Sequence, residues 1–221
     1  MIVWLRKVLI RLLLPVSWAL RRRRPVETLC QFAETESDSG WQFLRAFEQC
    51  PDPAQRAHLF HNLLEEREHS SLFTELVERR GGRVRLSTEN GRTSLLEQEG
   101  NMPAFLAYVH AGELDIANEF GAYARAVPDD DVRRVFENIK EEEDGHHSNL
   151  QGALLAIFPD PVKAAALVRR ARRRRTWRAF QRGSKRIGDT LLAVWLVILY
   201  VVLGPFCVFQ GRRRLARATR P

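Results

Sequence analysis

One pattern of glutamate and histidine residues occurs twice in the chain, and it limits the fold more than any other feature. Glu36 is followed 30 residues later by Glu66, and three residues after that by His69. A Glu and a His three positions apart share one face of an α-helix, so a Glu-x-x-His motif can direct a carboxylate and an imidazole at one point. The same residue types recur with the same separations 77 residues further on, at Glu113, Glu143 and His146. The repeat predicts two equivalent helical hairpins that face a shared site.

Apolar residues recur at helical spacing in four segments of the middle of the chain. The first runs over 26–49 and the second from Pro53 to Arg80, with Asp52 as the expected N-cap and Gly81-Gly82 as the stop. Two more follow Pro103 and Pro128, the last ending near Phe158. No segment alternates with a period of two, and residues 81–101 have the composition of a long connection. We therefore expect an all-α, four-helix bundle with a long crossover between its helix pairs.

Each of the four apolar stripes is interrupted by polar residues at positions that face the core. An unpaired buried carboxylate costs several kcal/mol, so a core with four of them needs compensation. Two divalent cations would supply it, with carboxylates bridging them and one imidazole on each. The alternative is that these are solvated charges on helix surfaces in an acid-rich region. The predicted metal ligands are Glu36, Glu66, His69, Glu113, Glu143 and His146, with His110 as an extra candidate one turn before Glu113.

In these motifs residues 26–158 resemble the ferritin-like diiron carboxylate superfamily, particularly its rubrerythrin-like and quinone-hydroxylase-like members. The resemblance rests on Glu36, Glu113, and the segments 66–69 and 143–146. It implies a bundle that binds two iron ions, with manganese as the alternative, and that reacts with dioxygen or peroxide. Phe43 lies seven residues after the first glutamate, where family members often have Tyr. The cysteine-ligated domain of rubrerythrins is missing, so electrons would come from another protein or a quinol.

Other polar residues near the motifs receive a weaker interpretation. Glu65 and Glu142 precede the ligand glutamates and point about 100° away from them, as surface groups or as hydrogen-bond partners of the ligands. His58, His61 and His147 are expected to be solvated rather than to bind metal. Tyr123 either lines the pocket or belongs to the core.

The C-terminal part of the chain is apolar in its centre and basic on both sides. Residues 190–209 contain no charge, and twenty helical residues span about 30 Å, the thickness of a bilayer core. We predict a transmembrane helix over 187–210, between a basic juxtamembrane segment, 169–186, and a basic tail, 211–221. A buried core helix and a kinked or re-entrant segment are the alternatives. The basic flanks favour a cytoplasmic location for the bulk domain, as in a bacterial inner-membrane protein.

Residues 1–24 carry seven basic residues and no acidic one. Arg6, Lys7 and Arg11 interrupt their apolar run, which makes a transmembrane helix costly. An amphipathic helix in the membrane interface fits better, with Trp4 and Trp18 at the depth of the lipid headgroups. A cleaved or disordered leader is the alternative.

The net charge of +8 is unevenly distributed along the chain, and this distribution argues against a nucleic-acid-binding domain. The predicted bundle domain, 25–168, has 13 basic and 26 acidic residues, and the excess of positive charge lies in two basic arms, 1–24 and 169–221. A nucleic-acid-binding protein should carry its basic surface on the folded domain, so we expect membrane lipid and not nucleic acid as the partner of these arms. The sequence favours a membrane-anchored diiron oxidoreductase: an oxidase, a hydroxylase or a peroxidase. The alternative is a non-catalytic accessory or assembly subunit of a membrane complex. Other subunits of such a complex, or further copies of the chain, are further candidate partners.

Overall fold

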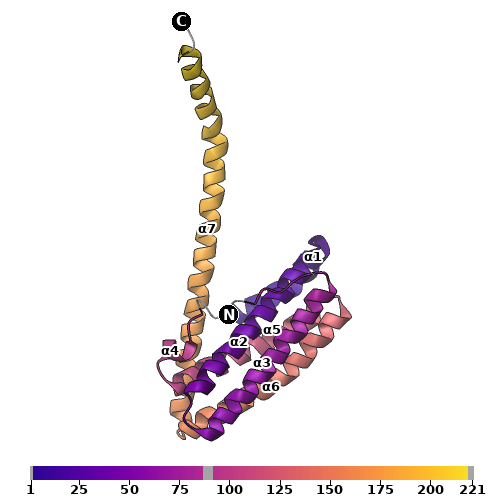
Figure 1. Ribbon diagram of the computed structural model, residues 1–221, viewed down its shortest axis with the longest axis vertical. Coiled ribbons are helices and arrows are strands. Elements are labelled where there is room, and N and C mark those ends of the chain that lie inside the picture. The colour runs from indigo at the N-terminus through magenta and orange to yellow at the C-terminus, as the bar shows by residue number, and fades with distance from the viewer. Residues whose placement is uncertain (1, 87–91, 219–221) are drawn as a thin grey trace. The chain divides into compact units, whose positions relative to one another are not determined.

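The computed structural model describes residues 2–86 and 92–218, and in that part of the chain it contains helices and no strands (Figure 1). Side chains are not described at residues 2–7, 9, 114, 144, 147, 182, 186, 187 and 203–218. The chain divides into two compact units, Met1–Arg172 and Arg173–Pro221. The predicted basic tail, 211–221, and residues 203–210 of the predicted span lie outside the described side chains.

Four long helices form the bundle in the first unit: α2 (Arg24–Gln49), α3 (Pro53–Arg79), α5 (Met102–Ala126) and α6 (Asp130–Ile157). Helices α2 and α3 form one hairpin, α5 and α6 form the other, and α3 packs against α6. The crossover between the hairpins contains one short helix, α4 (Leu95–Glu99). The prediction of an all-helical bundle with a long crossover is confirmed.

The residues expected to start and stop the helices do so. The side chain of Asp52 accepts a hydrogen bond of 2.7 Å from the backbone N–H of Gln55, which satisfies one free donor at the start of α3. Gly81 follows the end of α3 with a φ of 71°, a left-handed conformation that glycine adopts without strain. Asp129 caps α6 by accepting from the N–H groups of Asp131 and Val132. These local signals set the lengths of both hairpins.

The crossover is attached to α2 through the buried amide of Gln42. Its Oε1 accepts from the backbone N–H of Leu95 at 2.7 Å, and its Nε2 donates to the carbonyl of Thr93 at 3.3 Å. Both backbone groups lie at the start of α4, so the connection is fixed against the first hairpin.

Helix α1 (Ile2–Leu20) belongs to the same compact unit and packs against α5. Trp18 and Leu14 are 7% and 6% exposed and lie in the core, whereas Leu12 and Leu20 are 65% and 78% exposed. The expectation that Trp18 lies at headgroup depth is therefore corrected, because its ring fills the bundle's own core. The compact unit, Met1–Arg172, therefore extends beyond the predicted 25–168, and at its C-terminal end Ala171 is also buried in the core.

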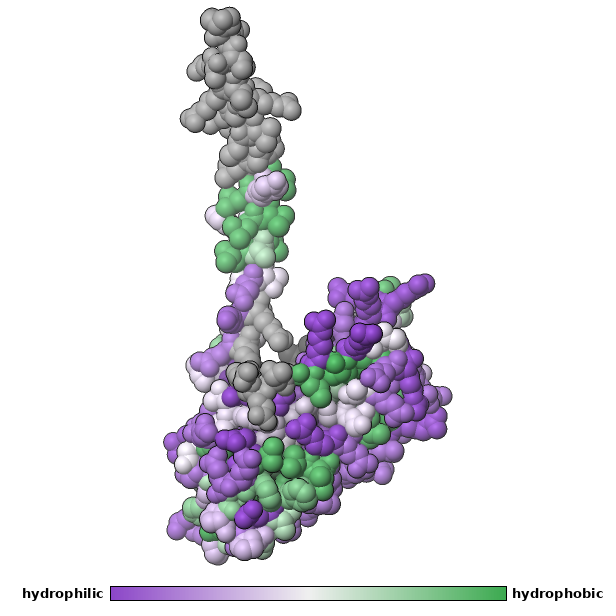
Figure 2. Space-filling view, viewed as in Figure 1, coloured by the Kyte–Doolittle hydropathy of each residue, from purple (hydrophilic) through white to green (hydrophobic). Residues whose placement is uncertain are grey.

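Helix α7 (Pro161–Ala218) starts in the first unit, where Ala164 and Ala171 are buried. In the second unit its large apolar side chains are exposed, including Trp195 at 58% and Tyr200 at 80%. Figure 2 shows hydrophobic residues on the surface of this helix. Within the part of the chain whose side chains are described, none of the helices is both long enough and apolar enough to cross a bilayer.

Candidate metal centre

Two hydrophobic clusters fill the bundle, and a layer of glutamate and histidine side chains separates them on every helix. Along α2, Ala33 lies in one cluster, Glu36 follows, and Phe43 lies in the other. Helix α3 places Glu66 and His69 at the same level, between Leu63 and Phe73. Glu113 on α5, and Glu143 and His146 on α6, hold the equivalent positions. The polar layer is therefore enclosed by apolar side chains at both ends.

The structure brings all six predicted ligands together. Each of the six residues as a whole is no more than 2% exposed, and their ligand atoms form two groups in which all atoms lie within 4.8 Å of one another. Glu66 and Glu143 belong to both groups, so a carboxylate from each hairpin can bridge two cation positions. The first group is Glu36, Glu66, His69 and Glu143, and the second is Glu66, Glu113, Glu143 and His146.

Several inward-facing atoms of this layer make no hydrogen bond to any described residue. They are Oε1 of Glu36, Oε2 of Glu66, both carboxylate oxygens of Glu143, and Nδ1 of His69. Nδ1 of His69 lies 3.4 Å from Oε1 of Glu143 and 3.9 Å from Oε2 of Glu36. A buried polar atom without a hydrogen bond is unfavourable, and a cation coordinated by these atoms would compensate for the missing bonds. Each of the two groups could thus hold a metal ion.

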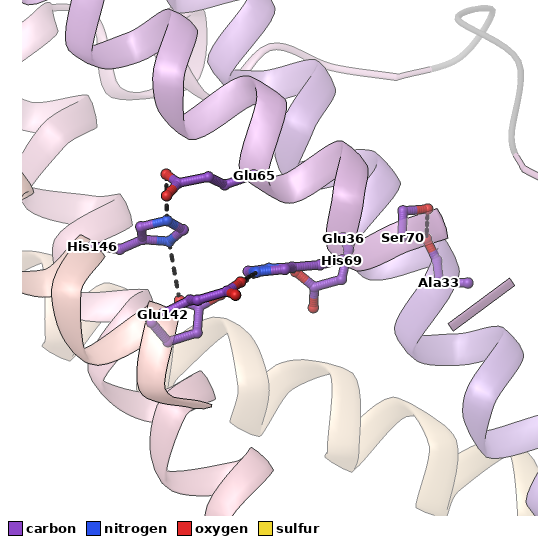
Figure 3. A network of polar contacts seen from close by, with 8 residues as sticks. Ala33, Glu36, Glu65, His69, Ser70, Glu142 and His146 are labelled. Carbon is purple, nitrogen blue, oxygen red and sulfur yellow. Dashed lines mark hydrogen bonds and ion pairs between the residues drawn. The ribbon is translucent and has the colours of Figure 1, made fainter. Parts of the chain in front are cut away.

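Each ligand histidine is held from outside the layer by a carboxylate of the opposite hairpin (Figure 3). Nε2 of His69 lies 2.7 Å from Oε2 of Glu142, and Nε2 of His146 lies 2.6 Å from Oε2 of Glu65. With its proton on Nε2, each imidazole donates to that carboxylate and keeps the lone pair of Nδ1 for a metal. Carboxylates in this position orient metal-binding histidines and raise their basicity.

From the sequence, Glu65 and Glu142 were expected to be surface groups or hydrogen-bond partners of the ligands, and the structure shows that they contact His146 and His69. A signal was available, because the 77-residue shift that relates the two sets of ligands also maps Glu65 onto Glu142. The same shift maps Phe43 onto Phe120, and these buried rings lie in different core clusters, one on each side of the polar layer. The internal repeat thus extends beyond the ligands.

The electrostatics of the layer follow from burial and from its crowded carboxylates. Burial raises the pKa of Glu66 well above its usual range, and the neighbouring carboxylates raise it further. Burial alone would lower the pKa of His69, but the carboxylates around it, Glu143 foremost, outweigh that effect and raise the pKa to about 10. For the same reason the pKa of His146 is raised. Burial acts to raise the pKa of Glu143, but His146 and His69 outweigh it and lower that pKa. Without metal, protonated histidines therefore balance part of the negative charge.

The other polar residues considered from the sequence lie elsewhere. His110 is buried at 6% exposure, but neither four-residue group of described residues includes it as a seventh ligand. Tyr123 packs in an aromatic cluster with Phe32 and Phe136, as expected of a core residue. His58 and His61 are exposed, as expected, and the side chain of His147 lies outside the described residues.

Comparisons of the chain with protein-family models, with curated proteins and with solved structures give no match.

Proposed function

We propose that the chain is a membrane-anchored diiron oxidoreductase whose centre reacts with dioxygen or peroxide. The observation that carries this proposal is the pair of overlapping ligand groups that share Glu66 and Glu143 in a buried layer. Four carboxylates and two imidazoles form a donor set suited to iron or manganese, whereas zinc and copper sites commonly use more nitrogen or sulfur ligands. The fold, the spacing and the donor set agree with the resemblance to ferritin-like diiron proteins.

The chain's own residues have separate roles in this proposal. His69 and His146 would each offer Nδ1 to one ion, and Glu36 and Glu113 would each offer a carboxylate that belongs to one group only. Bound iron would supply the redox chemistry with dioxygen or peroxide. The two core clusters exclude bulk water from the layer.

The membrane part of the proposal rests on the two basic arms. Large apolar side chains between Leu191 and Val202 are exposed, and the segment before them is rich in arginine. A lipid environment would cover this surface, and the arginines would contact anionic headgroups. A quinol or a membrane-bound donor protein would then reach the bundle from the bilayer. The basic flanks favour a cytoplasmic location for the bundle. Washing membranes that contain the protein with carbonate tests the anchor, because release of the chain into the wash would contradict the proposed membrane anchoring.

A second candidate function is a non-catalytic accessory subunit of a membrane complex. The protonated states of His69 and His146 favour it, because they neutralise part of the carboxylate charge without any metal. In this alternative the bundle keeps its shape, and α7 is the docking element.

Oxygen uptake distinguishes the two candidates. Full-length protein in lipid nanodiscs would be supplied anaerobically with iron(II) and a quinol, and then exposed to dioxygen. The oxidoreductase should consume oxygen repeatedly in proportion to the quinol, and His69→Ala should lose this activity. A bundle that stays folded without metal and consumes no oxygen would favour the accessory subunit.

A further inference from the structure

A row of contacting side chains, His61, Glu65 and His146, leads from the solvent to one side of the centre. Nε2 of His61 lies 3.2 Å from Oε1 of Glu65, whose other oxygen contacts the ligand His146. The exposure of these side chains falls step by step from 62% for His61 to 25% for Glu65 and 3% for His146. The next contact inward joins Nδ1 of His146 to Glu143 at 3.6 Å. Every residue in this row is of a type that binds divalent transition metals.

The two halves of the internal repeat differ at the outer end of this row. The 77-residue shift maps Glu65 onto Glu142 but maps His61 onto Asn138, which is exposed on α6. An amide is a much weaker ligand for a first-row transition metal than an imidazole. An exposed imidazole therefore precedes the carboxylate on the Glu65 side, whereas on the Glu142 side the carboxylate itself is 50% exposed and no imidazole precedes it.

A cavity lies along the same seam between α3 and α6. It has a volume of about 10 Å³, enough for about one water molecule, and is lined by polar residues, His58, Asn62 and Asn149 among them, as well as by apolar ones. Asn62 is one turn before Glu66 on α3, and Asn149 is one turn after His146 on α6. The packing between these two helices thus leaves a gap of about one water molecule near the centre, and side chains would have to move aside for an ion to pass.

We propose that His61 and Glu65, the uptake pair, are the first binding site for the divalent cations that fill the centre, an inference that rests on the proposed metal-binding function. Two ligand atoms at right angles around an ion, each about 2.1 Å away, lie about 3 Å apart, which is close to the observed separation. Glu65 contacts both the exposed imidazole of His61 and the imidazole of His146, so an ion held by the uptake pair would lie beside the centre.

Replacement of His61 by Asn tests this pair, because Asn keeps a donor for Glu65 but loses the strong metal ligand. Full-length protein in nanodiscs would be mixed with cobalt(II) in a stopped-flow instrument, and binding followed by the visible absorption of bound cobalt. We expect His61→Asn to fill several-fold more slowly and to release cobalt more slowly by the same factor. Its final stoichiometry and affinity should equal those of the wild type, because a route affects both directions equally.

The internal repeat provides a matched control. Asn138→His, made in the His61→Asn background, places the missing imidazole at the equivalent position on the other side and should restore part of the filling rate. His61→Asn that fills at the wild-type rate would overturn the proposal, and so would unchanged filling with faster release, which indicates that His61 only braces Glu65. Wild-type protein that binds no cobalt would instead overturn the proposed metal centre.

Discussion

The two ligand histidines connect the hairpins as well as filling positions in the polar layer. His69 comes from the first hairpin and contacts Glu142 of the second, and His146 comes from the second and contacts Glu65 of the first. Each imidazole is therefore oriented by a helix other than its own. Loss of either outer carboxylate should loosen a ligand without removing it.

We expect Glu65→Ala and Glu142→Ala each to lower metal affinity by about 10–100-fold while two ions still bind at saturation, the usual effect of losing a carboxylate behind a metal-bound histidine. Competition with a chelator of known affinity would measure the change. Glu68→Ala and Glu141→Ala are matched controls, since both side chains are exposed, and they should leave the affinity unchanged. Equal effects in all four variants would contradict the assigned role of the outer carboxylates.

The stability of the metal-free protein should fall as the pH rises above neutrality. The pKa of His69 is raised from 6.5 to about 10 in the folded state, so its protonation stabilises the fold fully below pH 6.5. This contribution is lost as the pH rises toward 10. Thermal unfolding at pH 6.5 and at pH 9.5 should show the loss, and metal-loaded protein should show less of it because the metal has already displaced the proton. A metal-free protein that is more stable at pH 9.5 would refute this assignment.

At the scale of the elements, the connection after α3 is tightly packed at Gly82. A Cβ at this position would lie 2.5 Å from Cγ1 of Val26 and 2.8 Å from Cγ1 of Val77. Both side chains are β-branched, which restricts the rotation by which they could move aside. Gly82→Ala should therefore destabilise the bundle by about 1–3 kcal/mol in urea unfolding followed by circular dichroism. Gly152→Ala is the control, because nothing lies within 4 Å of its added Cβ on α6, and it should stabilise by about 0.5–1 kcal/mol.

The boundaries of the elements and the clustering of the six candidate ligands could be predicted from the sequence because they depend on local chemistry. Asp52, Gly81 and Asp129 act within one turn of their own position, and the ligand pattern needs only helical spacing and a repeat. The role of Glu65 could not be derived in that way. Its direction on α3 follows from helical geometry, but its contact with His146 depends on where the second hairpin packs.

At the scale of the whole molecule, α1 is part of the bundle unit, which sequence patterning alone did not reveal. An apolar stripe on a helix has the same appearance whether it faces lipid or protein. In this chain Leu14 and Trp18 face protein, while Leu12 and Leu20 on the same helix stay exposed. The exposed side chains of Leu12 and Leu20 are the part of α1 that could contact lipid in the proposed function.

The fragment 25–168 should still fold as a helical bundle, but it should be less stable than the fragment 1–172. Removal of α1 uncovers the part of the core that Leu14 and Trp18 fill, which should cost about 2–5 kcal/mol. Urea unfolding of both fragments, followed by circular dichroism, measures the difference. Equal stability would show that α1 is dispensable for the core, and substantial β signal would contradict the architecture.

The metal content of the purified full-length protein is the most direct test of the account's central claim, that one buried layer binds two ions. After reconstitution with iron and removal of excess metal, elemental analysis should give two ions per chain. Glu66→Ala, His69→Ala, Glu143→Ala and His146→Ala should each lose most of this metal and stay folded, and Glu36→Ala and Glu113→Ala should do the same or keep one ion. A wild-type protein without bound metal, or ligand variants with the same metal content as Glu68→Ala, would contradict the account.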